Sequence, residues 1–246
     1  MAAQERRLRR RILDVTARRS TQLALAVVPA LLLLFGTCLA HTVAEGDQAF
    51  VRSSTGAQIV PFIYLGAKHM VTGYDHLLFL AGVIFFLYRL EEVALYVTLF
   101  AIGHSSTLLA GVLAGLHVNP FLVDAIIGLS VVYKALDNLD AFRTWFGWQP
   151  NAKAAVLLFG FFHGFGLATK LQELELARDG LVPNMIAFNV GVEIGQLLAL
   201  SAILLAMNYW RRTASFTRHA YAANVALLTA GFILTGFQLT GYAIGA

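Results

Sequence analysis

Long apolar runs, separated by short polar stretches, follow one another along the chain from about residue 60. Six of them are long enough to cross a membrane, since a hydrocarbon core about 30 Å thick needs about 20 apolar residues per helix. We therefore expect an all-α, polytopic bundle of six transmembrane helices that forms a single domain over residues 61–246. The predicted helices cover residues 62–89, 92–116, 119–139, 152–171, 183–209 and 219–244.

An earlier and less regular apolar run covers residues 21–40, after a strongly basic start. Its small size, with Pro29 and Gly36 inside it and Ala40 at its end, favours a signal peptide; a first anchor helix is the alternative. The predicted organisation is thus a basic region and signal peptide or anchor at 1–40, a polar periplasmic lead-in at 41–60, and the six-helix domain.

The composition indicates a membrane protein, and the distribution of charge predicts its orientation in the membrane. Hydrophobic residues make up 58% of the chain and charged ones 13%, whereas soluble domains carry about 25% charged residues. Basic residues mark cytoplasmic segments, which predicts a bacterial inner-membrane protein with a cytoplasmic N-terminus before any cleavage and a periplasmic C-terminus. The orientation of the protein in the membrane is enough to explain the basic N-terminus. We therefore expect the protein to contact the lipid bilayer and not to bind nucleic acid. The arginines concerned are Arg6, Arg7, Arg9, Arg10, Arg11, Arg18 and Arg19.

Three histidines and two carboxylates interrupt the predicted helices. An acid in a bilayer core costs about 2.5–3.5 kcal/mol on insertion scales, so such residues usually face the bundle interior and pair with each other or with an ion. Imidazole and carboxylate together are ligands for transition metals such as Ni, Co, Cu or Zn. A thiolate cluster is excluded because Cys38 is the only cysteine. The candidate metal ligands are Asp75, His76, His104, His163 and Glu193.

Depth along the helices predicts that these ligands meet. At 1.5 Å per residue, the three histidines and Glu193 lie about 12–16 Å below the outer ends of four different helices. Asp75 is expected either to bind the same ion or to orient a ligand histidine from behind. We expect Lys134, near a cytoplasmic helix end, to extend to the membrane surface. Residues expected to support the site or to line a pathway are His69, Asp124, Asn138, Asn189 and Gln196, with Asn189, Glu193 and Gln196 on one stripe.

Several stretches resemble the HupE/UreJ family of hydrogenase and urease accessory membrane proteins. The similarity extends over about residues 60–245, and the chain departs from the family pattern at Ala101, where Thr is usual, and at Asp124, where Glu is usual. The resemblance implies nickel or cobalt movement across the membrane and a metal-binding role for the five candidate ligands. It rests on GYDHLLFL (73–80), GHSSTL (103–108), VDAIIGLSVVYKALDN (123–138), FGFFHGFGLA (159–168) and AFNVGVEIGQL (187–197).

Three functions compete at this level. The leading interpretation is a permease for a divalent transition metal, Ni or Co, that works without ATP and has no catalytic residues. The second is an integral-membrane metalloenzyme with a fixed Cu, Zn or Fe ion and an open coordination position. The third is a proton-linked carrier for a small solute, since buried histidines and carboxylates also relay protons.

Overall fold

The computed structural model describes residues 45–173 and 178–245, and this part of the chain consists of helices and their connections, with no strand. The predicted signal peptide or anchor at 1–40 lies outside the described residues. The helices are α2 (Glu45–Ser53), α3 (Ile59–Thr72), α4 (Tyr74–Ile84), α5 (Leu90–Ala114), α6 (Pro120–Asn138), α7 (Ala141–Phe146), α8 (Ala152–Gln172), α9 (Leu181–Arg211) and α10 (Ala214–Ile244).

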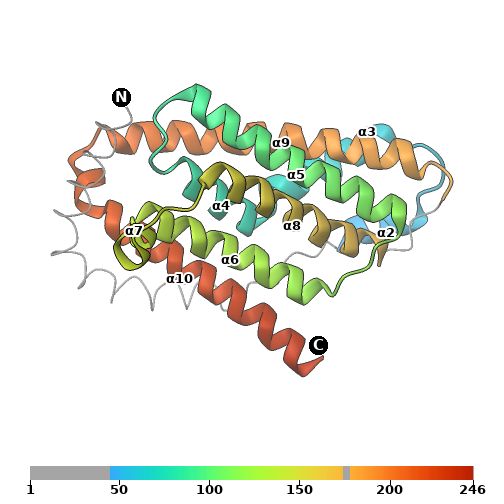
Figure 1. Cartoon of the computed structure of the whole chain (residues 1–246). Helices are drawn as coiled ribbons and strands as arrows, with labels where there is room; N and C mark the ends of the chain where they lie inside the picture. The colour runs from blue at the N-terminus through green and yellow to red at the C-terminus, as the bar shows by residue number, and fades with distance from the viewer. Residues whose placement is uncertain (1–44, 174–177, 246) are drawn as a thin grey trace.

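The helices lie side by side along one direction, with α2 near one end of the bundle and α7 near the other (Figure 1). At the end that holds α2, the amide of Asn184 donates to the Gly56 carbonyl and Gln172 donates to Leu116. At the end that holds α7, Arg211 donates to the Phe85 carbonyl at 3.0 Å. We call these the α2 end and the α7 end.

Four of these helices are long and apolar enough to cross a membrane: α5, α8, α9 and α10. Their outer faces expose large apolar side chains such as Ile102, Leu158 and Leu205, which suits contact with lipid rather than with water. The chain is therefore an all-α membrane protein. Helix α6 lies along the same direction, and the shorter α3 and α4 follow one another along it, α3 nearer the α2 end and α4 nearer the α7 end (Figure 1). The six-span arrangement stays a prediction.

Three tightly packed helix pairs form the frame: α3 with α9, α5 with α8, and α6 with α10. Each contact is lined by glycine. A Cβ on Gly66 would lie 2.0 Å from the Phe188 carbonyl oxygen, one on Gly164 would lie 2.1 Å from that of His104, and one on Gly128 would lie 2.6 Å from Thr235 Oγ1. Small residues allow membrane helices to approach this closely, and the gain in van der Waals contact holds each pair together.

The segment predicted as one helix over 62–89 is broken, which corrects that prediction. Gly73 ends α3 and precedes α4, with φ −72° and ψ 105°, an extended conformation. A side chain at this position would meet its neighbours, because a Cβ on Gly73 would lie 2.8 Å from His76 Nδ1. The short α4 packs against α3, α6, α9 and α10 and lies inside the bundle (Figure 1). The break thus places Asp75 and His76, in the first turn of α4, in the interior.

Candidate metal site

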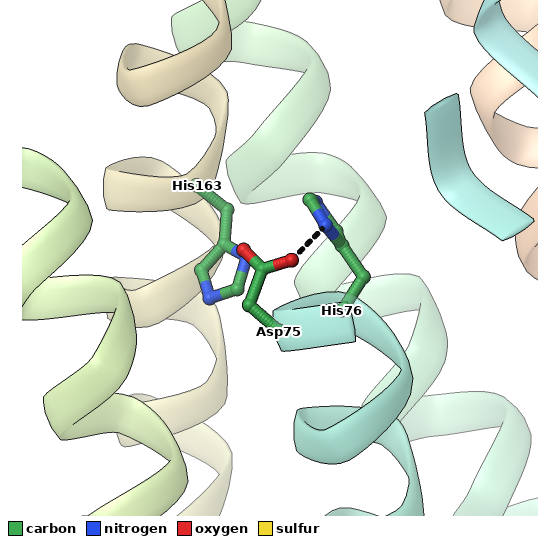
Figure 2. Close-up of side chains that lie close together, drawn as sticks. All are labelled: Asp75, His76 and His163. Atoms are coloured by element: carbon green, nitrogen blue, oxygen red, sulfur yellow. Dashed lines mark hydrogen bonds and ion pairs between the residues drawn. The ribbon is translucent and has the colours of Figure 1, made fainter. Parts of the chain in front are cut away.

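Asp75, His76 and His163 come together inside the bundle and form a candidate metal site. Asp75 and His76 lie in the first turn of α4, and His163 faces them from α8 (Figure 2). Each of the three residues is at most 2% exposed. One possible ligand atom from each lies within 4.8 Å of the others. The arrangement is a compact carboxylate–imidazole group that is shielded from solvent.

The carboxylate of Asp75 lies next to both imidazoles. His76 Nδ1 lies 3.0 Å from Asp75 Oδ1, and His163 Nδ1 lies 3.9 Å from Asp75 Oδ2. Since an ionised carboxylate only accepts hydrogen bonds, the neutral His76 ring donates from Nδ1 and presents a lone pair at Nε2. The N-terminus of a helix also favours a negative charge in its first turn, so the position of Asp75 on α4 stabilises its charged form.

Ser130 on α6 determines how His163 is oriented. The Ser130 hydroxyl donates to the Ile127 carbonyl at 2.6 Å, so its oxygen accepts from His163 Nε2 at 3.3 Å. With the proton of the neutral ring on Nε2, the Nδ1 lone pair faces Asp75 Oδ2. Two electron-pair donors at this separation repel each other and both attract a cation placed between them. A hydrogen bond to the distal nitrogen is the usual way in which a metal-binding histidine is positioned.

Two more histidines adjoin the group through His76. The His76 ring centroid lies 5.2 Å from that of His69 on α3 and 5.8 Å from that of His104 on α5. His104 is 1% exposed, and neither of its ring nitrogens has a hydrogen-bond partner among the described residues. A buried neutral imidazole without a hydrogen-bond partner has a lone pair available for a metal ion. The structure thus brings the three predicted histidines together, with His69 beside them.

Aromatic rings enclose the site on the side of the α7 end. The Phe100 ring lies 5.0 Å from that of His163, and the Phe79 ring lies 5.5 Å from it. Both phenylalanines are at most 1% exposed. Apolar walls keep the local dielectric low and so strengthen the attraction between an ion and its charged ligand.

Glu193 is not part of this group, contrary to the prediction from depth. Helix α9 buries Val192 and Gln196 on its packed face, whereas Glu193 and Ile194 lie on its exposed face. Successive residues of a helix turn by about 100°, so Glu193 faces outward although its neighbour Val192 is buried. The predicted stripe is divided as well: Gln196 is buried, Asn189 is half-buried at the edge, and Glu193 is exposed.

The remaining predicted residues take separate positions. Asp124 Oδ2 accepts from Lys170 Nζ at 2.6 Å, in an ion pair towards the α2 end. Asn138 donates to the Gly82 carbonyl at 2.9 Å, and this bond ties the end of α6 to α4. Gln196 donates to the Val97 carbonyl at 3.4 Å, and Asn189 Oδ1 is buried without a hydrogen-bond partner among the described residues.

Two features of the interior were missed from the sequence. Ser130, which positions His163, has the small size common in packed membrane helices, and only its distance from a ligand reveals its role. Lys134 was expected to extend to the membrane surface, but it is 6% exposed and bonded to Asp137, which is 5% exposed. Their spacing of three residues on one helix is a signal that could have revealed this pair.

The donor set of the site matches borderline transition metals. One carboxylate and two or three imidazoles suit ions such as Ni²⁺, Co²⁺, Zn²⁺ and Cu²⁺ better than Mg²⁺ or Ca²⁺, which prefer oxygen ligands alone. The buried Asp/His/His group is therefore able to hold a metal ion, although its ligands do not distinguish among these metals.

Comparison with known proteins adds the family. The family model described as HupE / UreJ protein matches residues 45–246, a range that includes every helix described above. No curated protein and no solved structure matches the chain. Because the match includes the site and the whole helical frame, the chain belongs to the HupE/UreJ family.

Proposed function

We propose that the chain is a permease for a divalent transition metal ion, Ni²⁺ or Co²⁺, which binds in transit to Asp75, His76 and His163. The observation that supports this most is the meeting of three buried ligand atoms within 4.8 Å at the start of an interior helix. His104 is the candidate for a further ligand. The family's association with nickel and cobalt movement supports the choice of ion.

The proposal includes an orientation. We infer that the α2 end faces the periplasm and the α7 end the cytoplasm of the bacterial inner membrane, because basic residues mark cytoplasmic segments. Arg143 and Lys153 lie at the α7 end, and both are exposed. Since the sequence carries no Walker loop, the ion would move down its gradient or be driven by the membrane potential.

The decisive experiment is uptake of radioactive nickel or cobalt into proteoliposomes. The purified wild-type chain is expected to load the vesicles, and His163→Ala is expected to abolish loading because it removes one of three ligands. His219→Ala is the matched control: this histidine bonds to Ser215 in the first turns of α10, away from the site. It should transport like the wild type.

A second readout separates transport from a fixed metal. The metal content of the purified protein is measured before and after exchange with a chelator. A wild-type protein that holds one metal ion tightly, yet moves neither nickel nor cobalt, copper or zinc, would contradict the permease and favour the metalloenzyme. A protein that binds no metal while it remains folded would rule out both.

A further inference from the structure

The charged pair of Lys134 and Asp137 lies between the metal site and the α7 end. The stem of Lys134 crosses α4 at Gly82, where a Cβ would lie 3.1 Å from Lys134 Cγ. Gly82 follows His76 by six residues, or about 9 Å of helix. On α6, Lys134 is one turn beyond Ser130, which touches His163. On both helices the pair therefore lies one to two turns from the site.

The carboxylate of Asp137 is already paired with a cation. One of its oxygens bonds to the Lys134 ammonium and the other accepts from Gln149 Nε2 in the α7–α8 connection. The ammonium is a monovalent cation on a flexible stem. Asp137 is thus a buried anion that is paired with a cationic side chain of the same helix.

A buried tyrosine hydroxyl lies near this pair. The Tyr133 ring lies 5.3 Å from that of Phe159, which is one turn before His163 on α8. Tyr133 Oη is buried and has no hydrogen-bond partner among the described residues. Along α6, Tyr133 lies between Ser130 and the Asp137 carboxylate.

A purely structural role explains the pair poorly. Desolvation of two buried charges offsets most of their attraction, and apolar residues in their place often give equal or greater stability. Ionisable residues inside membrane proteins mark ion pathways more often than not. Conduction needs sites that bind an ion and also release it. A tethered ammonium that competes for the carboxylate would keep such a site weak.

We propose that Asp137 is a second, transient site for the divalent cation, and that the Lys134 ammonium occupies it until the ion arrives. The ion displaces the ammonium from Asp137, passes to the α7 end, and the ammonium returns. No covalent bond changes. This inference rests on the proposed transport function and adds an exit site to it.

The test compares variants by nickel uptake and by nickel content. The double variant Lys134→Met/Asp137→Asn removes both charges and leaves no lone buried charge, so it should fold as the wild type does. It is expected to keep nickel at the Asp75 group but to transport about tenfold or more slowly, because the exit carboxylate is gone. Lys153→Met is the control, since Lys153 is exposed at the same end.

The single variant Lys134→Met gives a second, independent measurement. Without its ammonium, Asp137 should take up nickel itself, so the nickel content of the folded protein rises from one ion to two per chain. Wild-type uptake by the double variant, or an unchanged nickel content in Lys134→Met, would overturn the proposal. If the wild type itself transports nothing, the permease fails, and the nickel contents still decide whether Asp137 is a cation site.

Discussion

At the scale of single residues, the hydroxyl of Ser130 has a role that activity alone would not reveal. It accepts from His163 Nε2 and so directs the Nδ1 lone pair towards Asp75. Ser130→Ala is expected to lower metal affinity about 10–100-fold, as the loss of such supporting bonds usually does, with little change in stability. A metal titration measures this. Ser106→Ala is the control, since Ser106 donates to a carbonyl of its own helix and is exposed.

Glu193 gives a residue-scale prediction on which sequence and structure differ. The sequence predicts a metal ligand, whereas the structure places the side chain on the exposed face of α9. Glu193→Gln keeps the shape and removes the charge. We expect unchanged metal stoichiometry and affinity in detergent, measured by elemental analysis and titration. A loss of the bound ion in the folded variant would mean that Glu193 reaches the site in another conformation.

At the scale of elements, the break between α3 and α4 makes its own prediction. Gly73→Ala would place a methyl group 2.8 Å from His76 Nδ1, and overpacking of this kind typically costs about 1–3 kcal/mol. The variant is expected to lose metal affinity as the Asp75–His76 pair is displaced. Gly236→Ala is the control: nothing lies within 4 Å of its Cβ, and alanine is favoured over glycine in a helix by about 0.5–1 kcal/mol.

The elements also show what a sequence reveals and what it does not. Hydrophobic runs predict the long helices well: 92–116 was expected and Leu90–Ala114 is observed. Depth predicts that His76, His104 and His163 meet, because the rise per residue is nearly constant. The direction of Glu193 depends on which face of α9 packs against α3. The sequence does not show which face this is, because the outer face of α9 is apolar as well. The break at Gly73 arises from tertiary contacts that no local pattern contains.

At the scale of the whole molecule, metal should act as a clamp between helices. An ion held by Asp75 and His163 joins α4 to α8, and ligand binding to the folded state stabilises it by about 2.7 kcal/mol at a hundredfold excess over Kd. Nickel is expected to raise Tm in detergent. Protons compete with the ion for imidazole nitrogens, so the increase should be present at neutral pH and lost below about pH 6. A nickel-induced shift of the same size at pH 5 would contradict a histidine site.

The glycine contacts determine which parts of the molecule are able to move past one another. Helices whose backbones touch at Gly164 and Gly128 have no room to slide past one another. Each of the pairs α3–α9, α5–α8 and α6–α10 therefore moves as one rigid unit, which we call a plate. Asp75 and His76 lie on α4, which belongs to none of the three pairs, whereas His163 lies in the α5–α8 pair. A shape change that releases an ion therefore has to occur along the borders of these pairs. Spin labels at Ile102 and Leu158, both exposed within one plate, should keep their distance when nickel binds. Labels at Leu129 and Leu158, on two plates, should change theirs.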